Sequence, residues 1–237
     1  MTLRLALLLL ALLPLTACNR QPASSATAPA AENAPASVAA APGGLVAGVD
    51  YILIPNGQPY APLDGKVEVA EAFGYTCPHC AHFEPLLVGW KAKLPANARF
   101  VSVPAAFGGR WDTFARGYYA AESIGLVEKT HEAMFRAIHV DGTMSPDPTV
   151  EQIAAFYAQH GADAAAFAST MRSVPVDAKL GHARQFLAHS EVQGAPPLGT
   201  PMMVVNGKYR VDAGEGGYEK MLDTVDKLVA YESAPGG

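Results

Sequence analysis

Two cysteines separated by two residues, Cys77 and Cys80, stand between a strand-like segment and a helix-like segment. Before them, residues 66–73 combine valines on one face with small alanines on the other, which is typical of a short strand buried on both sides. After them, apolar residues recur at helical spacing over residues 81–94. Residues 99–103 predict a second strand, so the cysteine pair falls inside a strand, helix, strand unit of right-handed parallel type.

After residue 103 the sequence predicts a series of helices, followed by two more strands. Helical periodicity dominates residues 111–193, where Thr149 and Gln152 have the spacing of a helix-starting capping box. Two short strands follow, and Asn206-Gly207 between them favours a two-residue hairpin. A last helix is expected over residues 218–231. Pro85 is expected to kink the helix that follows the cysteines.

The order of these elements predicts an α/β fold in which a helical domain is inserted between two halves of a sheet-containing domain. We place the insertion at residues 108–194, and the sheet domain at residues 45–107 and 195–234. Phe107 and Trp111, near the first boundary, are expected in the core.

The amino-terminal residues read as an export signal. Arg4 precedes an apolar run that is shorter than the ~20 residues needed to span a bilayer. Leu15-Thr16-Ala17-Cys18 resembles the lipobox of bacterial lipoproteins, which implies a signal peptide over residues 1–17 and lipidation of Cys18. The alternative is an ordinary signal cut near Ala17. Asn19 would permit transfer to the outer membrane if the rule for enteric lipoproteins applies.

Residues 18–44 form the next segment, which is rich in alanine and proline and has no apolar periodicity. That composition is typical of a flexible tether between an anchor and a folded domain.

Two thiols at the start of a helix have the arrangement that a reversible disulfide needs. The helix amino terminus presents unpaired N–H groups and a partial positive charge to the first sulfur. We therefore expect Cys77 to be the exposed nucleophile and Cys80 the resolving thiol. Pro78 suits the first helical turn, and the imidazole of His79 would stabilise a thiolate. A stabilised thiolate favours the reduced protein, which makes the disulfide form an oxidant.

Two other interpretations of the cysteine pair remain open at this point. A structural disulfide over so short a loop would remove little entropy from the unfolded chain. A zinc site using Cys77, Cys80 and His82 would need a fourth ligand, and the other histidines lie in helical stretches without a second ligand pair. We therefore expect no metal and no cofactor besides the cysteine pair itself. The formal net charge of −5 and the absence of a basic run give no support for a nucleic-acid partner.

The sequence Cys77-Pro78-His79-Cys80, the preceding EAFGYT and the later GTPMMVVNGKY together resemble the DsbA family of thiol:disulfide oxidoreductases, over roughly residues 50–232. The resemblance implies a thioredoxin-like fold with a helical insertion. It also implies a periplasmic oxidase, which a quinone-linked DsbB-like membrane protein would reoxidise. The substrates would be unfolded exported proteins, and we expect a monomer.

The resemblance also assigns further site residues. Pro201 matches a cis-proline beside the active disulfide, and the backbone of Thr200 would pair with an extended substrate. Glu71 matches a buried acid near the resolving thiol, where it could transfer a proton to or from Cys80; a hydrogen-bonded core carboxylate is the alternative. Two interpretations remain for Phe73, Tyr75 and Met202: they line a substrate groove, or they are ordinary core residues.

Some residues depart from the enteric pattern. Thr200 stands where valine is familiar, and threonine there is also found in disulfide isomerases of the family. An isomerase or reductase is therefore the alternative with the same chemistry, although residues 19–44 offer no dimerisation domain. A substrate-binding module with an inactive cysteine pair is the alternative from another class.

Overall fold

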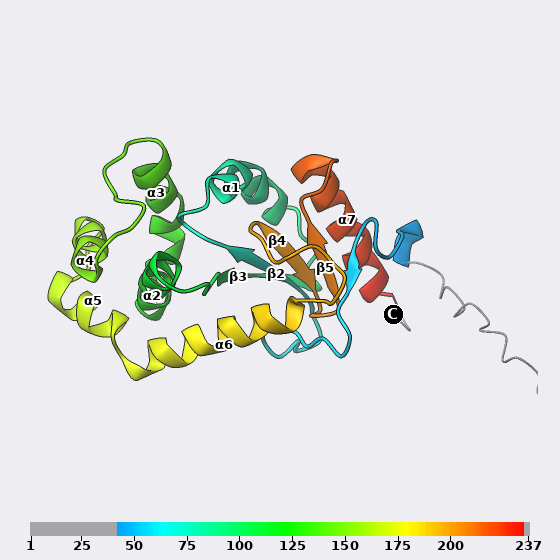
Figure 1. The fold of residues 1–237 in the computed structure, drawn as a ribbon, viewed down its shortest axis with the longest axis horizontal. Helices are drawn as coiled ribbons and strands as arrows, with labels where there is room; N and C mark the ends of the chain where they lie inside the picture. Colours follow the sequence, from blue (N-terminus) through cyan, green and yellow to red (C-terminus); the bar gives the residue numbers. More distant parts are fainter. Residues whose placement is uncertain (1–41, 235–237) are drawn as a thin grey trace, which may run out of the picture. The chain divides into compact units, whose positions relative to one another are not determined.

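The computed structural model describes residues 42–234 (Figure 1). The expected signal peptide, the Cys18 site and nearly all of the expected tether lie outside these residues. Pro42, which we had placed in the tether, is buried and opens a 3₁₀ turn, Pro42–Gly44 (η1). Gly43 packs closely against Lys227, so the packed region begins before Leu45. The expected boundary at residue 45 stays a prediction, and Pro42 and Gly43 lie against the folded region on its amino-terminal side.

A five-stranded sheet forms the centre of the described region, with the order β1-β5-β4-β2-β3. Its strands are β1 Ile52–Leu53, β2 Val67–Phe73, β3 Ala98–Pro104, β4 Met202–Val205 and β5 Tyr209–Asp212. Strands β2 and β3 are parallel, and the other neighbours are antiparallel. The short edge strand β1 was not predicted, because two residues carry no periodicity.

Seven helices complete the described residues: α1 Pro78–Lys91, α2 Arg110–Ser123, α3 Val127–His139, α4 Val150–Gln159, α5 Ala164–Met171, α6 Val174–Ser190 and α7 Gly217–Glu232. Helices α2 to α6 follow one another between β3 and β4 (Figure 1). Helix α1 continues through Pro85. No helix among residues 42–234 is long and apolar enough to span a bilayer.

The cap of α4 and the turn between β4 and β5 both form where the sequence predicts them. Thr149 caps α4 through a capping box, in which its hydroxyl accepts from the Gln152 N–H and the Gln152 side chain accepts from the Thr149 N–H. Asn206 and Gly207 both have positive φ, as a type I′ turn requires. The register pairs Val205 with Tyr209, so three residues connect the strands where two were expected.

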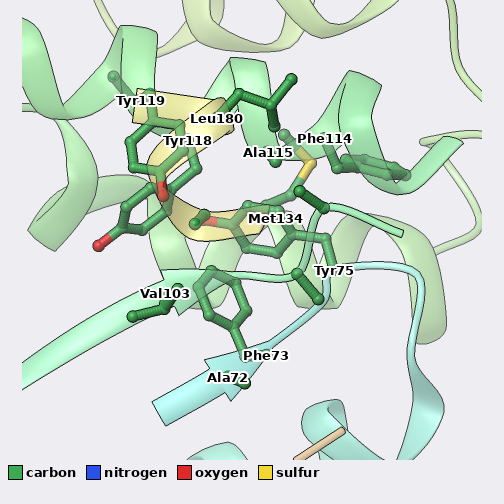
Figure 2. Packing of buried hydrophobic residues seen from close by; sticks show 14 of the residues in the cluster. Ala72, Phe73, Tyr75, Val103, Phe114, Ala115, Tyr118, Tyr119, Met134 and Leu180 are labelled. Atoms are coloured by element: carbon green, nitrogen blue, oxygen red, sulfur yellow. The ribbon is translucent and has the colours of Figure 1, made fainter. Parts of the chain in front are cut away.

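Side chains alternate between the two faces of the sheet and form two cores. Val69, Met203 and Val205 pack with residues of α1 and α7 on one face. Ala70, Ala72 and other small residues face the helices of the insertion. Figure 2 shows the second core close to the end of β2, where rings and aliphatic groups from α2, α3 and α6 meet the strand.

Phe107 was expected in the core, but its side chain is 43% exposed and lies edge to face against Trp111. The Trp111 ring in turn covers Gly74, where a Cβ atom would lie 2.1 Å from the ring. Only glycine therefore allows this tryptophan to approach the segment that leads into the cysteine pair.

Candidate active site

Cys77 occupies the residue immediately before α1, and Cys80 lies one turn into that helix. Both cysteines are free thiols and both are buried, so the expectation that Cys77 is exposed was wrong. The Cys77 sulfur caps the helix by accepting a hydrogen bond from the Cys80 N–H at 3.4 Å. Pro78 fills the first helical turn, where its missing N–H leaves no hydrogen bond unmade. The sequence thus places the first sulfur at the positive end of a helix.

The surroundings of the two sulfurs push their pKa values in opposite directions. The pKa of Cys77 is lowered, chiefly because the Cys80 thiol donates a hydrogen bond to its sulfur, with further help from the Thr200 side chain and the backbone N–H groups of Cys80 and His79. Burial raises the pKa of Cys80. Cys77 is therefore the thiolate-forming residue and Cys80 the protonated one.

His79 lies on the surface at the start of α1, and its ring points toward α7. The Tyr218 hydroxyl donates to the His79 carbonyl oxygen at 3.2 Å and lies 3.5 Å from its Nδ1 atom. The backbone N–H of His79 is one of the causes of the lowered pKa of Cys77. Sequence reasoning assigned the effect to the imidazole and missed Tyr218, which is distant in sequence.

Pro201 enters the site from the segment between α6 and β4. Its peptide bond with Thr200 is cis, as the resemblance implies. The Cys77 thiol donates to the Thr200 carbonyl oxygen at 3.3 Å. A groove of about 540 Å³ runs beside these residues and is lined by His79, Pro196, Pro197, Thr200, Pro201 and Tyr218 among others. The site therefore combines a reactive sulfur with an adjoining surface that can hold a chain segment.

Glu71 lies on β2, beneath α1, and is 1% exposed. Its Oε2 atom has no hydrogen-bond partner among the described residues. Burial, followed by the nearby charge of Glu84, raises the pKa of Glu71 to about 8, so it holds a proton at neutral pH. A charge on Glu71 would in turn raise the pKa of Cys80.

Glu84 and His131 belong to the same buried region and were not predicted. Glu84 follows Cys80 by four residues on α1, so helical spacing was a signal for it. Its Oε2 lies 3.4 Å from the His131 Nε2 atom, and its Oε1 lies 3.5 Å from Lys91 Nζ. Hydrogen bonding and electrostatic interaction with His131 and Lys91 keep the pKa of Glu84 below its usual value despite burial. No sequence signal pointed to His131.

Helix α3 holds Tyr75, two residues before Cys77, at two points. The Tyr75 hydroxyl lies 2.8 Å from His131 Nδ1, and the Tyr75 carbonyl oxygen accepts from His139 Nε2 at 2.7 Å.

The structure distinguishes the two interpretations of Phe73, Tyr75 and Met202. All three are at most 1% exposed and belong to the core (Figure 2 labels Phe73 and Tyr75).

No metal site accompanies the thiols in the described part of the chain. Among residues 42–234, no three His, Cys, Asp or Glu side chains gather as metal ligands, and this includes Cys77, Cys80 and His82.

A helix-capping thiolate, a buried resolving thiol and an adjacent cis-proline on a mixed sheet define a thioredoxin-fold thiol:disulfide oxidoreductase. No family model matches the chain. It is 39% identical to the thiol:disulfide interchange protein DsbA of Azotobacter vinelandii, over 81% of this chain and 86% of that protein. For DsbA of Pseudomonas aeruginosa PAO1, identity is 39% over 79% of this chain and 86% of that protein.

Solved structures agree with the sequence relatives. The crystal structure of the oxidoreductase DsbA from Xylella fastidiosa matches with a TM-score of 0.76 and 43% identity, and covers 81% of this chain and 99% of that one. DsbA of Pseudomonas aeruginosa matches with a TM-score of 0.71 and 39% identity, over 79% of this chain and 94% of that one. The chain belongs to the DsbA family of thiol:disulfide interchange proteins and is an enzyme with that chemistry.

Proposed function

We propose that this enzyme transfers a Cys77–Cys80 disulfide to reduced exported proteins. A substrate thiolate attacks the Cys77 sulfur, the bond to Cys80 breaks, and Cys80 leaves with the electron pair. A second substrate thiolate then attacks the substrate sulfur of this mixed disulfide, and Cys77 leaves as a thiolate. The substrate loses two electrons and the enzyme gains them. The lowered pKa of Cys77 carries the proposal, because a stable thiolate is the better leaving group and favours the reduced enzyme.

We infer that Glu71 assists the first step. Cys80 leaves as a thiolate in a buried place that raises its pKa, so it must receive a proton. Glu71 is protonated at neutral pH because burial raises its pKa to about 8. We assign it the delivery of that proton, directly or through water.

Thr200 and Pro201 are assigned to substrate binding, and Pro78 and His79 to tuning the potential. The Thr200 carbonyl oxygen already lies beside the Cys77 sulfur, so an extended chain that pairs with this backbone would bring its cysteine to the reactive atom. Pro78 and His79 contribute through the geometry of the first turn of α1.

Redox equilibrium with glutathione tests the oxidase proposal. We expect an oxidising potential and complete loss of protein oxidation in Cys77→Ser. A strongly reducing potential would favour the reductase or isomerase that Thr200 suggests. Retention of full activity by Cys77→Ser would instead mean that the cysteine pair is not the catalytic group.

Reoxidation requires an electron acceptor outside the chain. A quinone-linked membrane protein of DsbB type is the partner that the family resemblance suggests, and we propose that the enzyme works in the periplasm as a monomer. Reoxidation of the reduced enzyme by membranes that contain quinone, compared with membranes depleted of quinone, tests this partner.

Lipidation of Cys18 would hold the enzyme at a membrane through the tether of residues 18–44. The support is the Leu15-Thr16-Ala17-Cys18 sequence after the apolar run. Labelling with a radioactive fatty acid should mark the wild-type protein and leave Cys18→Ala unlabelled. Equal labelling of both proteins, or of neither, would show that Cys18 is not lipidated.

A further inference from the structure

Arg210 is a fully buried arginine on β5, with a side chain that is 0% exposed. Its Nε donates to Asp212 Oδ1 at 2.9 Å, and its Nη2 lies 2.8 Å from Asp212 Oδ2. Nη2 also donates to the carbonyl oxygens of Pro196 and Pro197 at 3.0 Å each. Nη1 lies 3.4 Å from the carbonyl oxygen of Ser190, the last residue of α6. Arginine in a central apolar strand is unusual, and every contact here is to the β5 neighbour or to the segment after α6.

The segment that receives these bonds has few of its own. Among the described residues 192–201, the one bond that the backbone makes to itself runs from the Ala195 N–H to the Val192 carbonyl oxygen. Pro196 and Pro197 have no N–H to donate, so the backbone of these two residues can be held only through its carbonyl oxygens. Arg210 occupies both points.

A guanidinium suits this task better than other cations. Its planar fork presents several N–H groups at fixed angles, so one side chain can bond two adjacent carbonyl oxygens and a carboxylate together. The buried charge is compensated by Asp212, which is 30% exposed and reaches the surface. The pair therefore links β5, the end of α6 and the proline segment into one unit.

The attached segment leads directly into the active site. Pro196, Pro197, Thr200 and Pro201 line the groove of about 540 Å³ beside Cys77, and Asp212 lines the same groove. The position of Pro196 and Pro197 thus sets the groove wall and the path of the chain up to Thr200.

We propose that Arg210, paired with Asp212, is a positioning residue that holds the segment 192–201 in place for polypeptide substrates. It does not touch the sulfurs, and it acts through Pro196 and Pro197 on the groove and on the Thr200 backbone. A small dithiol needs only the disulfide and is therefore independent of it. The inference rests on the proposed function, because it assigns the groove to polypeptide binding.

The test compares two reductants of the oxidised enzyme: dithiothreitol and a short unfolded peptide that carries two cysteines. Arg210→Met should raise KM for the peptide by about tenfold or more, since bonds from a charged donor to the loop are lost, with little change in kcat. The rate with dithiothreitol should stay within about twofold of wild type, because about half a kilocalorie per mole or less is expected where the reductant does not use the groove. Arg210→Lys should raise KM for the peptide as Arg210→Met does, because lysine keeps the positive charge but lacks the planar guanidinium that bonds several acceptors at once.

Amide hydrogen exchange gives a readout that does not depend on activity. Exchange should increase at the non-proline residues of segment 192–201 in Arg210→Met and remain unchanged in β2 and α1. If Arg210→Met fails to fold, the double variant Arg210→Met with Asp212→Asn removes the unpaired charge and serves in both measurements. Arg184→Met, which breaks the exposed pair with Asp112, is the matched control.

Three outcomes would overturn the inference. The first is an unchanged KM for the peptide in folded Arg210→Met. The second is an equal loss of rate with dithiothreitol and peptide, which would place the effect at the sulfur. The third is Arg210→Lys with wild-type KM. If wild type itself does not oxidise the peptide, the proposed function fails, while the exchange measurement still decides whether Arg210 holds the segment.

Discussion

The carbonyl oxygen of Thr200 lies 3.3 Å from the sulfur of Cys77, although 123 positions separate the two residues along the chain. The hydroxyl of the same threonine helps to lower the pKa of Cys77. Thr200 therefore contacts Cys77 through its backbone carbonyl oxygen and influences the pKa of Cys77 through its side chain.

Thr200→Val should raise the pKa of Cys77 and make the enzyme less oxidising. Valine keeps the shape of threonine but cannot donate to the sulfur, so the thiolate loses one of its stabilising contacts. The thiolate absorbance near 240 nm as a function of pH measures the pKa, and a glutathione titration measures the potential. Thr200→Ser keeps the hydroxyl and should stay closer to wild type. An unchanged titration in Thr200→Val would show that the hydroxyl does not act on Cys77.

Cys80 should influence Cys77 through its thiol proton. The Cys80 thiol is the largest cause of the lowered pKa of Cys77, so Cys80→Ala should raise that pKa, whereas Cys80→Ser supplies another donor and should raise it less. Iodoacetamide modification of Cys77 at several pH values gives the pKa in both variants. If the two variants titrate alike, the donor is unimportant.

Glu71 should make the stability of the reduced protein depend on pH. Its pKa rises from 4.5 to about 8 on folding, so between these values the native state binds a proton that the unfolded state lacks. This contribution is fully present below about pH 4.5 and is lost as pH rises through about 8, by at most about 1.4 kcal/mol per pH unit. Glu71→Gln should remove it, as measured by urea unfolding from pH 5 to 8.

The exposed Glu215 provides the matched control for this experiment. Glu215→Gln should keep the pH dependence of wild type. A wild-type slope in Glu71→Gln as well would mean that another group takes up the proton.

Tyr75 should contribute to stability through its contact with α3. Tyr75→Phe removes the hydroxyl that lies 2.8 Å from His131 Nδ1 and leaves that buried atom without its partner, at a cost of about 1–3 kcal/mol. Urea unfolding measures the change. Tyr231→Phe, at a half-buried tyrosine near the end of α7, is the control and should change stability by less than about 0.5 kcal/mol. Equal losses in the two variants would argue against the bond.

Local features of the fold could be predicted because each depends on a few neighbouring residues. Thr149 and Gln152 form the capping box, and Asn206-Gly207 makes the hairpin. Pro78 lies in the first turn of α1, as the same kind of reasoning predicts. Strand β1 and the burial of Pro42 could not be found, since they depend on packing partners that are remote in sequence.

The sequence by itself determined the chemistry of this protein. Cys77 and Cys80 are spaced for a reversible disulfide, and the helix that starts between them supplies N–H groups to the first sulfur without help from the rest of the chain. The tertiary structure decided what surrounds these sulfurs. Thr200 reaches Cys77, Glu84 and His131 meet near Glu71, and Arg210 fixes the segment before Pro201 only after distant elements have packed. Burial gives these contacts their strength, and burial is a property of the whole fold that no local pattern encodes.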